Sequence, residues 1–377
     1  MKQFLLSFTM LASCAAGALA AQATFSKDGN SVFYSPLEGA SLVQAHLNPF
    51  REETIDLEKF VGDQDVYEVS LRTSDGAILF GTRTQIWAYH PNSKKAEKLA
   101  EAPRGVLLDD IAYDPSTEGV IVTALYQSEP HTPFDHPSLW WLGKGSRDFT
   151  QIVLNRVGQL EGLAVTQSGE VFFGCEGDLW HGVVAADEDA VAAGHAGSLV
   201  AYRYAPMASR ETFPGPPTQV GVRNVAIAGS KIYAHIRRLG DTGWGSIVRV
   251  NAPKGVDPNE ACGDTLDRRL ETYREALASA ELVMKSNHRG RLCASADGHR
   301  VFFTVENEPF LVENDGPAKS LAPAQEETKA TPTPTPTQHN LDSWVNPTPT
   351  PKPSPTPKTK ATPTPKPKFR VFQPVLQ

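Results

Sequence analysis

The sequence lacks the short motifs that mark several large enzyme classes. It contains no Gly-x-Ser-x-Gly, no Gly-x-x-x-x-Gly-Lys, no His-Glu-x-x-His and no Cys-x-x-Cys. The sequence motifs therefore give no support to the usual hydrolase, nucleotide-binding or zinc-finger assignments. Charged residues, at 21%, are not in excess, and hydrophobic residues, at 40%, suffice for a core. The chain as a whole is therefore not disordered. Beyond its first twenty residues, no stretch is long and apolar enough to span a membrane.

Negative charge is nearly absent from the last part of the chain. Residues 328–377 hold six lysines and Arg370 against Asp342 alone, a charge of +6, and because the whole chain carries −7, residues 1–327 carry −13. The same segment holds 13 of the 30 prolines, which remove backbone donors and favour extended polyproline II. We therefore predict an acidic folded body and a disordered Pro/Thr/Lys-rich tail over residues 326–377. An acidic body argues against nucleic acid as a partner.

The amino terminus has the layout of a secretory signal peptide. An apolar run over residues 4–16 is too short to span a bilayer, and Ala18-Leu-Ala20 suits cleavage before Ala21. A second interpretation stays open, because Leu11-Ala-Ser-Cys14 resembles a bacterial lipobox in which Cys14 carries a lipid. We expect removal of residues 1–20, or of those before Cys14, and export to the periplasm or cell surface, with membrane attachment only through that lipid.

Two short patterns alternate six times between residues 21 and 325. The first is a turn followed by a β-rich run, and its six turn glycines are Gly29, Gly76, Gly119, Gly169, Gly229 and Gly298. The second is a short strand, seen at Ser41-Leu-Val43, Gln85-Ile-Trp87, Ser138-Leu-Trp140, Ser198-Leu-Val200, Ser246-Ile-Val248 and Pro309-Phe-Leu-Val312. Successive turn glycines lie 47, 43, 50, 60 and 69 residues apart, near the period of a propeller blade. We therefore predict an all-β fold in which residues 21–325 form a six-bladed β-propeller of four-stranded blades.

Individual blades resemble known propeller families. Gly162-Leu-Ala-Val165 with Ser168-Gly-Glu-Val-Phe-Phe173 resembles the strand pair of NHL and SMP-30/gluconolactonase-like propellers. Residues 74–82 resemble the blade signature of two-component-regulator propellers, and residues 25–29 resemble the turn of TolB/WD40-like propellers. The resemblance implies the propeller fold, which by itself hosts many different functions.

A helical insertion is predicted in the fifth blade over residues 258–284. Asp264 is suited to cap it, and its apolar residues recur at alternating spacings of four and three: Leu266, Leu270, Tyr273, Leu277, Ala280 and Met284. We expect this helix to dock on the propeller itself, and a partner-binding helix is the alternative. In an oxidising compartment a disulfide between Cys262 and Cys293 would close the segment, whereas buried free thiols are the alternative.

Polar residues begin the predicted innermost strands. In propellers of the resembled kind these strands line a central channel, and the start of each lies on the face where ligands bind. The residues expected at this channel mouth are Glu68, Asp109, Asp110, Glu161, Arg223, Asn224 and Arg291, with Trp244 from a long loop. They are interpreted either as a hydrated ring in which the arginines neutralise the acids, or as a ligand site.

Part of this set has donors suited to a divalent cation such as Ca²⁺ or Zn²⁺. Glu68, Asp110, Glu161 and Asn224 offer oxygen ligands, and resemblance to SMP-30-like lactonases implies a catalytic metal held by Glu, Asn and Asp from different blades. The sequence departs from that family at Glu161, where the family motif has Asn. A weaker metal set is His131, Asp135 and His136 on a proline-rich loop.

These observations favour a binding or scaffold module over an enzyme. We expect it to act at the bacterial cell envelope, with a protein or an envelope polymer as partner. The alternative is a metal-dependent lactonase or esterase of SMP-30-like type that uses the carboxylates at the same channel mouth. The apolar end of the tail, residues 369–377, is interpreted as a short docking peptide.

Overall fold

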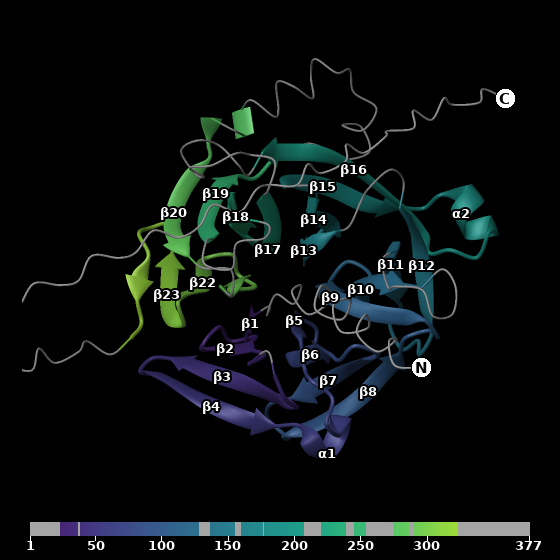
Figure 1. Ribbon diagram of the computed structural model, residues 1–377, viewed down its shortest axis with the longest axis horizontal. Helices are drawn as coiled ribbons and strands as arrows, with labels where there is room; N and C mark the ends of the chain where they lie inside the picture. Colours follow the sequence, from purple (N-terminus) through teal and green to yellow (C-terminus); the bar gives the residue numbers. More distant parts are fainter. Residues whose placement is uncertain are drawn as a thin grey trace, which may run out of the picture. The chain divides into compact units, whose positions relative to one another are not determined.

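The strands follow one another along the chain as six groups of four, which Figure 1 shows arranged around a central axis. The computed structural model describes residues 23–322 except 37, 128–135, 155–159, 176, 207–219, 239–244, 254–274, 277 and 287–289. The amino-terminal segment, residues 1–22, and the tail, residues 323–377, lie outside the described residues.

The bounds of the elements follow the predicted repeat. The first two groups are β1 (Ala23–Phe25), β2 (Ser31–Tyr34), β3 (Ser41–Leu47) and β4 (Phe50–Asp56), then β5 (Glu68–Arg72), β6 (Ala77–Gly81), β7 (Gln85–His90) and β8 (Lys95–Glu101). The next two are β9 (Val106–Asp114), β10 (Gly119–Tyr126), β11 (His136–Leu142) and β12 (Phe149–Leu154), then β13 (Glu161–Val165), β14 (Glu170–Cys175), β15 (Asp178–Ala185) and β16 (Gly197–Pro206). The last two are β17 (Val220–Ala228), β18 (Lys231–Arg238), β19 (Gly245–Asn251) and β20 (Glu281–Ser286), then β21 (Leu292–Ala294), β22 (Arg300–Val305), β23 (Glu308–Glu313) and β24 (Lys319–Ser320). The short helices α1 (Glu58–Val61) and α2 (Glu188–Ala192) lie between strands.

Each group is an antiparallel meander, as a propeller blade requires. The third and fourth blades also join through a parallel pairing of β12 with β16, so that eight strands form one sheet. The innermost strands are β1, β5, β9, β13, β17 and β21, and each contacts its neighbours around the ring. The predicted all-β propeller is therefore confirmed. No helix among the described residues is long and apolar enough to cross a membrane.

The turn that joins the first two strands of a blade has a chemical basis in the sequence. In the first blade, the hydroxyl of Ser26 donates to Asp28 (2.6 Å) and accepts the backbone N–H of Ser31 (3.0 Å). The sixth blade repeats this arrangement at Ser295 and Asp297. Side chains that satisfy backbone groups within the turn favour it over other local conformations. The glycine next to each aspartate then takes up the positive φ angle.

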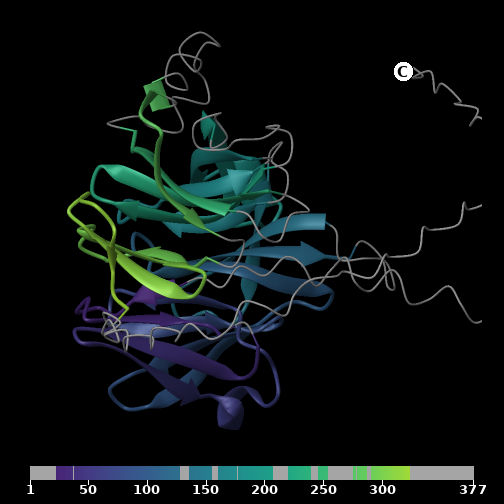
Figure 2. The same cartoon turned by 60° about the vertical axis from the view of Figure 1, so that its left-hand side comes forward.

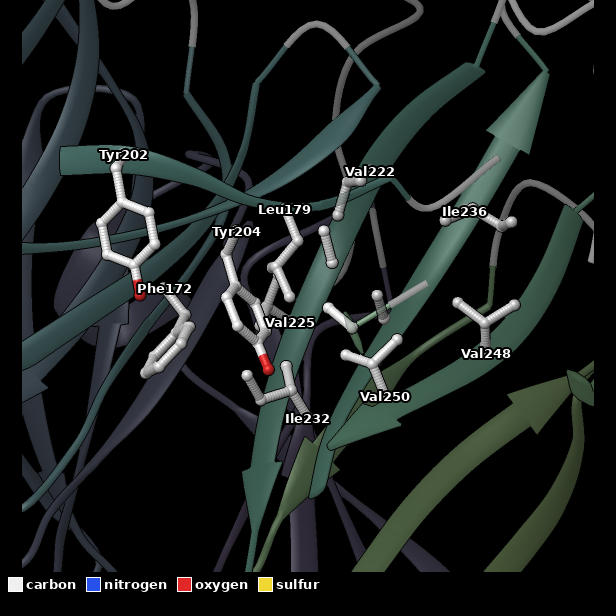
Figure 3. Packing of buried hydrophobic residues seen from close by; sticks show 13 residues of the cluster. Phe172, Leu179, Tyr202, Tyr204, Val222, Val225, Ile232, Ile236, Val248 and Val250 are labelled. Atoms are coloured by element: carbon white, nitrogen blue, oxygen red, sulfur yellow. The ribbon is translucent and has the colours of Figure 1, made fainter. Parts of the chain in front are cut away.

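Apolar side chains pack between neighbouring blades rather than within one. Figure 3 shows such a cluster between the fourth and fifth blades. Phe172, Tyr202 and Tyr204 from the fourth blade and Val222 and Val248 from the fifth belong to this cluster, and all five are at most 4% exposed. Burying each such side chain contributes about 1.5–3 kcal/mol, so the blade interfaces hold the ring together.

Among the described residues, no strand is shared between the first and last blades. Tyr34 of β2 stacks on Phe302 of β22 with the ring centroids 6.5 Å apart. Arg300 donates to the carbonyl oxygen of Gly29 at 2.7 Å, and its guanidinium lies over the ring of Phe25. Figure 2 shows the sixth blade (yellow-green) next to the first (purple). Closure therefore depends on side-chain packing and on Arg300.

The predicted helical insertion lies mostly outside the described residues. Residues 275, 276 and 278 are helical, but residues 281–284 belong to β20. The prediction therefore extended too far, because Leu282 and Met284 fit a strand as well as a helix. They pair with β19, which would otherwise present an unpaired edge.

Of the two alternatives for the cysteines, Cys293 agrees with a buried free thiol. It lies in the apolar cluster that joins the first and sixth blades. Burial raises the pKa of this thiol well above its usual value. Cys262 lies outside the described residues. The strand in which Cys293 lies, β21, directs its side chain into the core.

Candidate functional site

Three successive inner strands are irregular where their charged residues lie. The pairing of β9 with β10 shifts register at Asp109 and Asp110, which lie opposite Thr123. The pairing of β13 with β14 shifts between Glu161 and Ala164, and that of β17 with β18 shifts at Arg223. A bulge interrupts the regular alternation of side chains between the two faces of a strand and changes the direction in which they point. Bulges are common beside active sites. Figure 1 shows these three strands next to one another near the axis.

Asp110 links two blades from a buried position. Its side chain is 4% exposed, and its backbone N–H donates to the hydroxyl of Thr123 at 2.9 Å. Its Oδ2 accepts the backbone N–H of Gly162, in the next blade, at 2.8 Å. Gly162 has a φ angle of 66°, and a Cβ there would lie 2.6 Å from the carbonyl oxygen of Arg223. Only glycine therefore lets the three inner strands approach so closely.

The electrostatics of this cluster favour a neutral Asp110. Burial raises the pKa of Asp110 to about 8, the charges of Asp109 and Glu161 add to the effect, and the Gly162 N–H and Arg223 oppose it. Burial raises the pKa of the half-buried Asp109 to about 6, while Arg223 and Arg83 oppose the shift. Burial therefore favours the protonated form of Asp110 more strongly than that of Asp109, and the two interacting carboxyls titrate as a pair. Such a pair can both accept and donate a proton.

Arg83 belongs to this cluster, although sequence reasoning missed it. It lies on the loop between β6 and β7, and its guanidinium carbon is 4.8 Å from the centroid of the Tyr67 ring. Its charge is one of those that act on Asp109. The sequence feature that would have pointed to it is its place on a loop between the second and third strands of a blade, on the face expected to bind ligands.

The other predicted mouth residues lie in or next to inner strands but make different contacts. Glu68 begins β5 and is 1% exposed. Asn224 is equally buried, donates from Nδ2 to the carbonyl oxygen of Gly290 at 3.3 Å, and leaves its Oδ1 with no hydrogen-bond partner in the described part of the chain. Arg291 turns to the first blade, where it lies over the Tyr34 ring at 4.1 Å and donates to a backbone carbonyl. The expected neutralisation of the acids therefore falls to Arg223 and Arg83.

The central channel holds a cavity of about 510 Å³ at the other ends of the inner strands. It extends to the turns that follow these strands, and its lining includes Asn224, Ser70 and Thr166 among aliphatic side chains. Asn224 lines this cavity and directly follows Arg223 in the chain, so it lies between the charged channel mouth and the cavity.

Among the described residues, no three His, Cys, Asp or Glu side chains are grouped so that they could hold a metal ion. The Asp110 carboxyl accepts a backbone N–H, and the charge of Arg223 acts on it. The cation set of Glu68, Asp110, Glu161 and Asn224 stays a prediction.

Several predicted residues lie outside the described residues: Cys14, His131, Asp135, Trp244 and Cys262. His136 begins β11, and its ring is 5.0 Å from that of Tyr126. The weaker metal set on the proline-rich loop thus stays a prediction.

Comparison with known proteins identifies the fold. No protein-family model and no curated protein matches the sequence. A solved structure assigned as a gluconolactonase matches 80% of this chain and 91% of its own, with 10% identity and a TM-score of 0.52. Regucalcin, a calcium-binding protein from Agrobacterium tumefaciens, matches 76% of this chain and 82% of its own, with 12% identity and a TM-score of 0.47. A Xanthomonas campestris gluconolactonase matches 77% and 85%, with 9% identity and a TM-score of 0.47. At these identities the likeness concerns the fold alone, and the chain has the fold of the β-propellers that include gluconolactonase-like proteins.

Proposed function

We propose that the chain is a hydrolase that acts on a small ester or lactone at the charged channel mouth. The observation that carries this proposal is the pair of adjacent carboxyls, Asp109 and Asp110, which lie together in a bulge of β9 and whose pKa values are both raised by burial, that of Asp110 more than that of Asp109. A scaffold gains nothing from a buried protonated carboxyl, which reduces its stability at neutral pH. The gluconolactonase assignment of a structure with the same fold agrees with this class of reaction.

The two carboxyls have complementary roles. The Asp109 carboxylate accepts a proton from a water molecule whose oxygen forms a bond with the substrate carbonyl carbon. The proton of Asp110 passes to the leaving oxygen as the carbon–oxygen bond breaks. Transfer of a proton from Asp109 to Asp110 then restores both groups, and the products are a carboxylic acid and an alcohol. Arg223 supplies positive charge beside the pair, where negative charge develops on the carbonyl oxygen.

The proposal is tested with the purified protein on a panel of sugar lactones and aryl esters. Hydrolysis by the wild type, with loss of about a hundredfold or more in kcat for Asp110→Asn, supports it, since removing a general acid typically costs 10²–10⁴-fold. Each assay is run with a chelator and with added Ca²⁺, Zn²⁺ or Mn²⁺. Binding of a panel compound without hydrolysis under any of these conditions would favour the binding module and contradict the hydrolase.

Export is part of the proposal. It is supported by the signal-peptide layout of residues 1–20 and the lipobox-like residues before Cys14. Under this proposal the basic tail keeps the enzyme near anionic polymers of the cell envelope. Mass spectrometry of the mature protein tests the processing: a chain that begins at Ala21 and one that begins with a lipidated Cys14 differ in mass, and a retained Met1 would contradict export.

A further inference from the structure

Arg83 is held in place by a chain of contacts. Its backbone carbonyl oxygen accepts the N–H of Leu108 in β9 at 2.8 Å, which fixes the loop to the strand that carries Asp109. Its guanidinium stacks on Tyr67 at 4.8 Å, and the Tyr67 hydroxyl donates to Asp65 at 3.1 Å. A stacked guanidinium keeps its planar edge available for hydrogen bonds. Arg83 is therefore a positioned cation and not a freely rotating surface side chain.

The donors of Arg83 are not used within the part of the chain that the structure describes. No carboxylate or carbonyl oxygen there accepts a hydrogen bond from its guanidinium, and it has no ion pair. Arg72 and Arg249, in contrast, each direct two nitrogens at a carboxylate, Asp75 and Glu281 respectively. Arg83 is thus held by stacking beside the acids, and within the described residues its guanidinium makes no hydrogen bond to a carboxylate. At the edge of a proposed active site, such an arginine is arranged to bind an anion from outside.

We propose that the substrate carries a carboxylate and that Arg83 binds this group, which directs the ester or lactone carbonyl toward Asp109 and Asp110. The placement of the ester for hydrolysis rests on the proposed function, whereas the binding of a carboxylate by Arg83 does not. A planar guanidinium matches a carboxylate through two parallel N–H···O bonds. A singly charged carboxylate fits better than a doubly charged phosphate, because Glu161 and ionised Asp109 are nearby and repel a second negative charge.

Binding is measured by calorimetry with glutarate and with the neutral glutaramide, which has the same length. Glutarate is expected to bind more tightly, and Arg83→Gln is expected to weaken it by roughly ten- to a hundredfold, since hydrogen bonds between charged groups have about this effect. Arg83→Lys keeps the charge but not the planar fork, so a smaller loss is expected. Tyr67→Leu removes the stacking and weakens binding in the same direction. Arg147→Gln, an exposed arginine in the turn between β11 and β12, is the control and should bind as the wild type does.

The reaction is followed in parallel with mono-4-nitrophenyl glutarate and the neutral 4-nitrophenyl butyrate. Arg83→Gln should lower kcat/KM for the first ester, mainly through KM, and leave the second unchanged. The inference is overturned if glutarate and glutaramide bind equally or if glutarate does not bind measurably. It is also overturned if both esters are hydrolysed equally and Arg83→Gln does not alter either rate. Arg83-dependent binding of glutarate without hydrolysis of either ester supports the inference and contradicts the hydrolase, so the two proposals fail separately.

Discussion

Replacing Asp110 with asparagine should make the protein more stable at neutral pH while strongly lowering the proposed hydrolytic activity. The unfolded chain releases the proton of this aspartate at a pH near 3.9, whereas burial raises the folded-state pKa to about 8. Between these two values the folded protein holds a proton that the unfolded chain has lost. The free energy of unfolding therefore falls as the pH rises from about 4 to about 8. Asparagine carries no such proton, and its Oδ1 can accept the N–H of Gly162 as the carboxyl does.

The size of the effect follows from the pKa difference. At pH 7 the folded state holds the proton about three pH units above the unfolded-state pKa, and each unit is worth about 1.4 kcal/mol, which sets an upper limit near 4 kcal/mol. Relaxation of the protein and water around the ionised carboxyl makes the effect smaller than this upper limit. We therefore expect Asp110→Asn to raise the free energy of unfolding by about 2–4 kcal/mol at pH 7. Below about pH 4 the carboxyl is neutral in both states, and the two proteins should be equally stable.

The assay is urea unfolding of the two proteins at several pH values between 4 and 8. Asp114→Asn is the matched control, because Asp114 is buried at the other end of β9 and accepts hydrogen bonds from Ser116 and Thr117. That variant weakens bonds within a turn and should lose about 0.5–2 kcal/mol. If Asp110→Asn is destabilised to a similar extent at pH 7, then Asp110 is an ionised structural carboxylate and the reasoning is refuted.

Three further predictions concern the packing of the ring. Gly162→Ala should lower the free energy of unfolding by about 2 kcal/mol or more in urea titrations, because a side chain at this positive φ would meet the carbonyl oxygen of Arg223; unchanged stability would contradict the close approach. Arg300→Ala should cost about 1–3 kcal/mol in the same assay, because it removes the bond to Gly29 that joins the last blade to the first. The Cys293 thiol should resist iodoacetamide in the folded protein and react in urea, as peptide mass spectrometry would show; modification of the folded protein would contradict its burial.

The blades could be predicted from sequence because their determinants are local. A glycine turn such as Asp28-Gly29 specifies a hairpin through its own side chains and the positive φ angle of the glycine. Six copies of this hairpin at the period of a blade are compatible with few folds other than a propeller. The same period placed Asp109, Asp110, Glu161 and Arg223 at equivalent strand starts. Their convergence in the structure follows from that equivalence.

The rest of the site depends on contacts that no local pattern specifies. Arg83 acts on Asp109 across two blades, and its stacking on Tyr67 appears only when the second blade is folded. Arg291 occupies an equivalent strand start, but the Tyr34 ring on the first blade draws its guanidinium away from the acids. Met284 continued a helical spacing in the sequence, yet pairing with β19 determines its conformation. In each case tertiary packing overrides the sequence pattern.

The central claim, that Asp109 and Asp110 transfer protons in hydrolysis, is tested most directly by the pH dependence of kcat/KM on an ester or lactone that the protein hydrolyses. The wild type should give a bell-shaped profile with limbs near pH 6 and pH 8, the values to which burial raises the pKa of Asp109 and Asp110. Asp109→Asn should lose the acid limb and Asp110→Asn the alkaline limb, both with strongly reduced rates, while Asp114→Asn keeps the wild-type profile. A wild-type rate and profile in Asp110→Asn would contradict the claim.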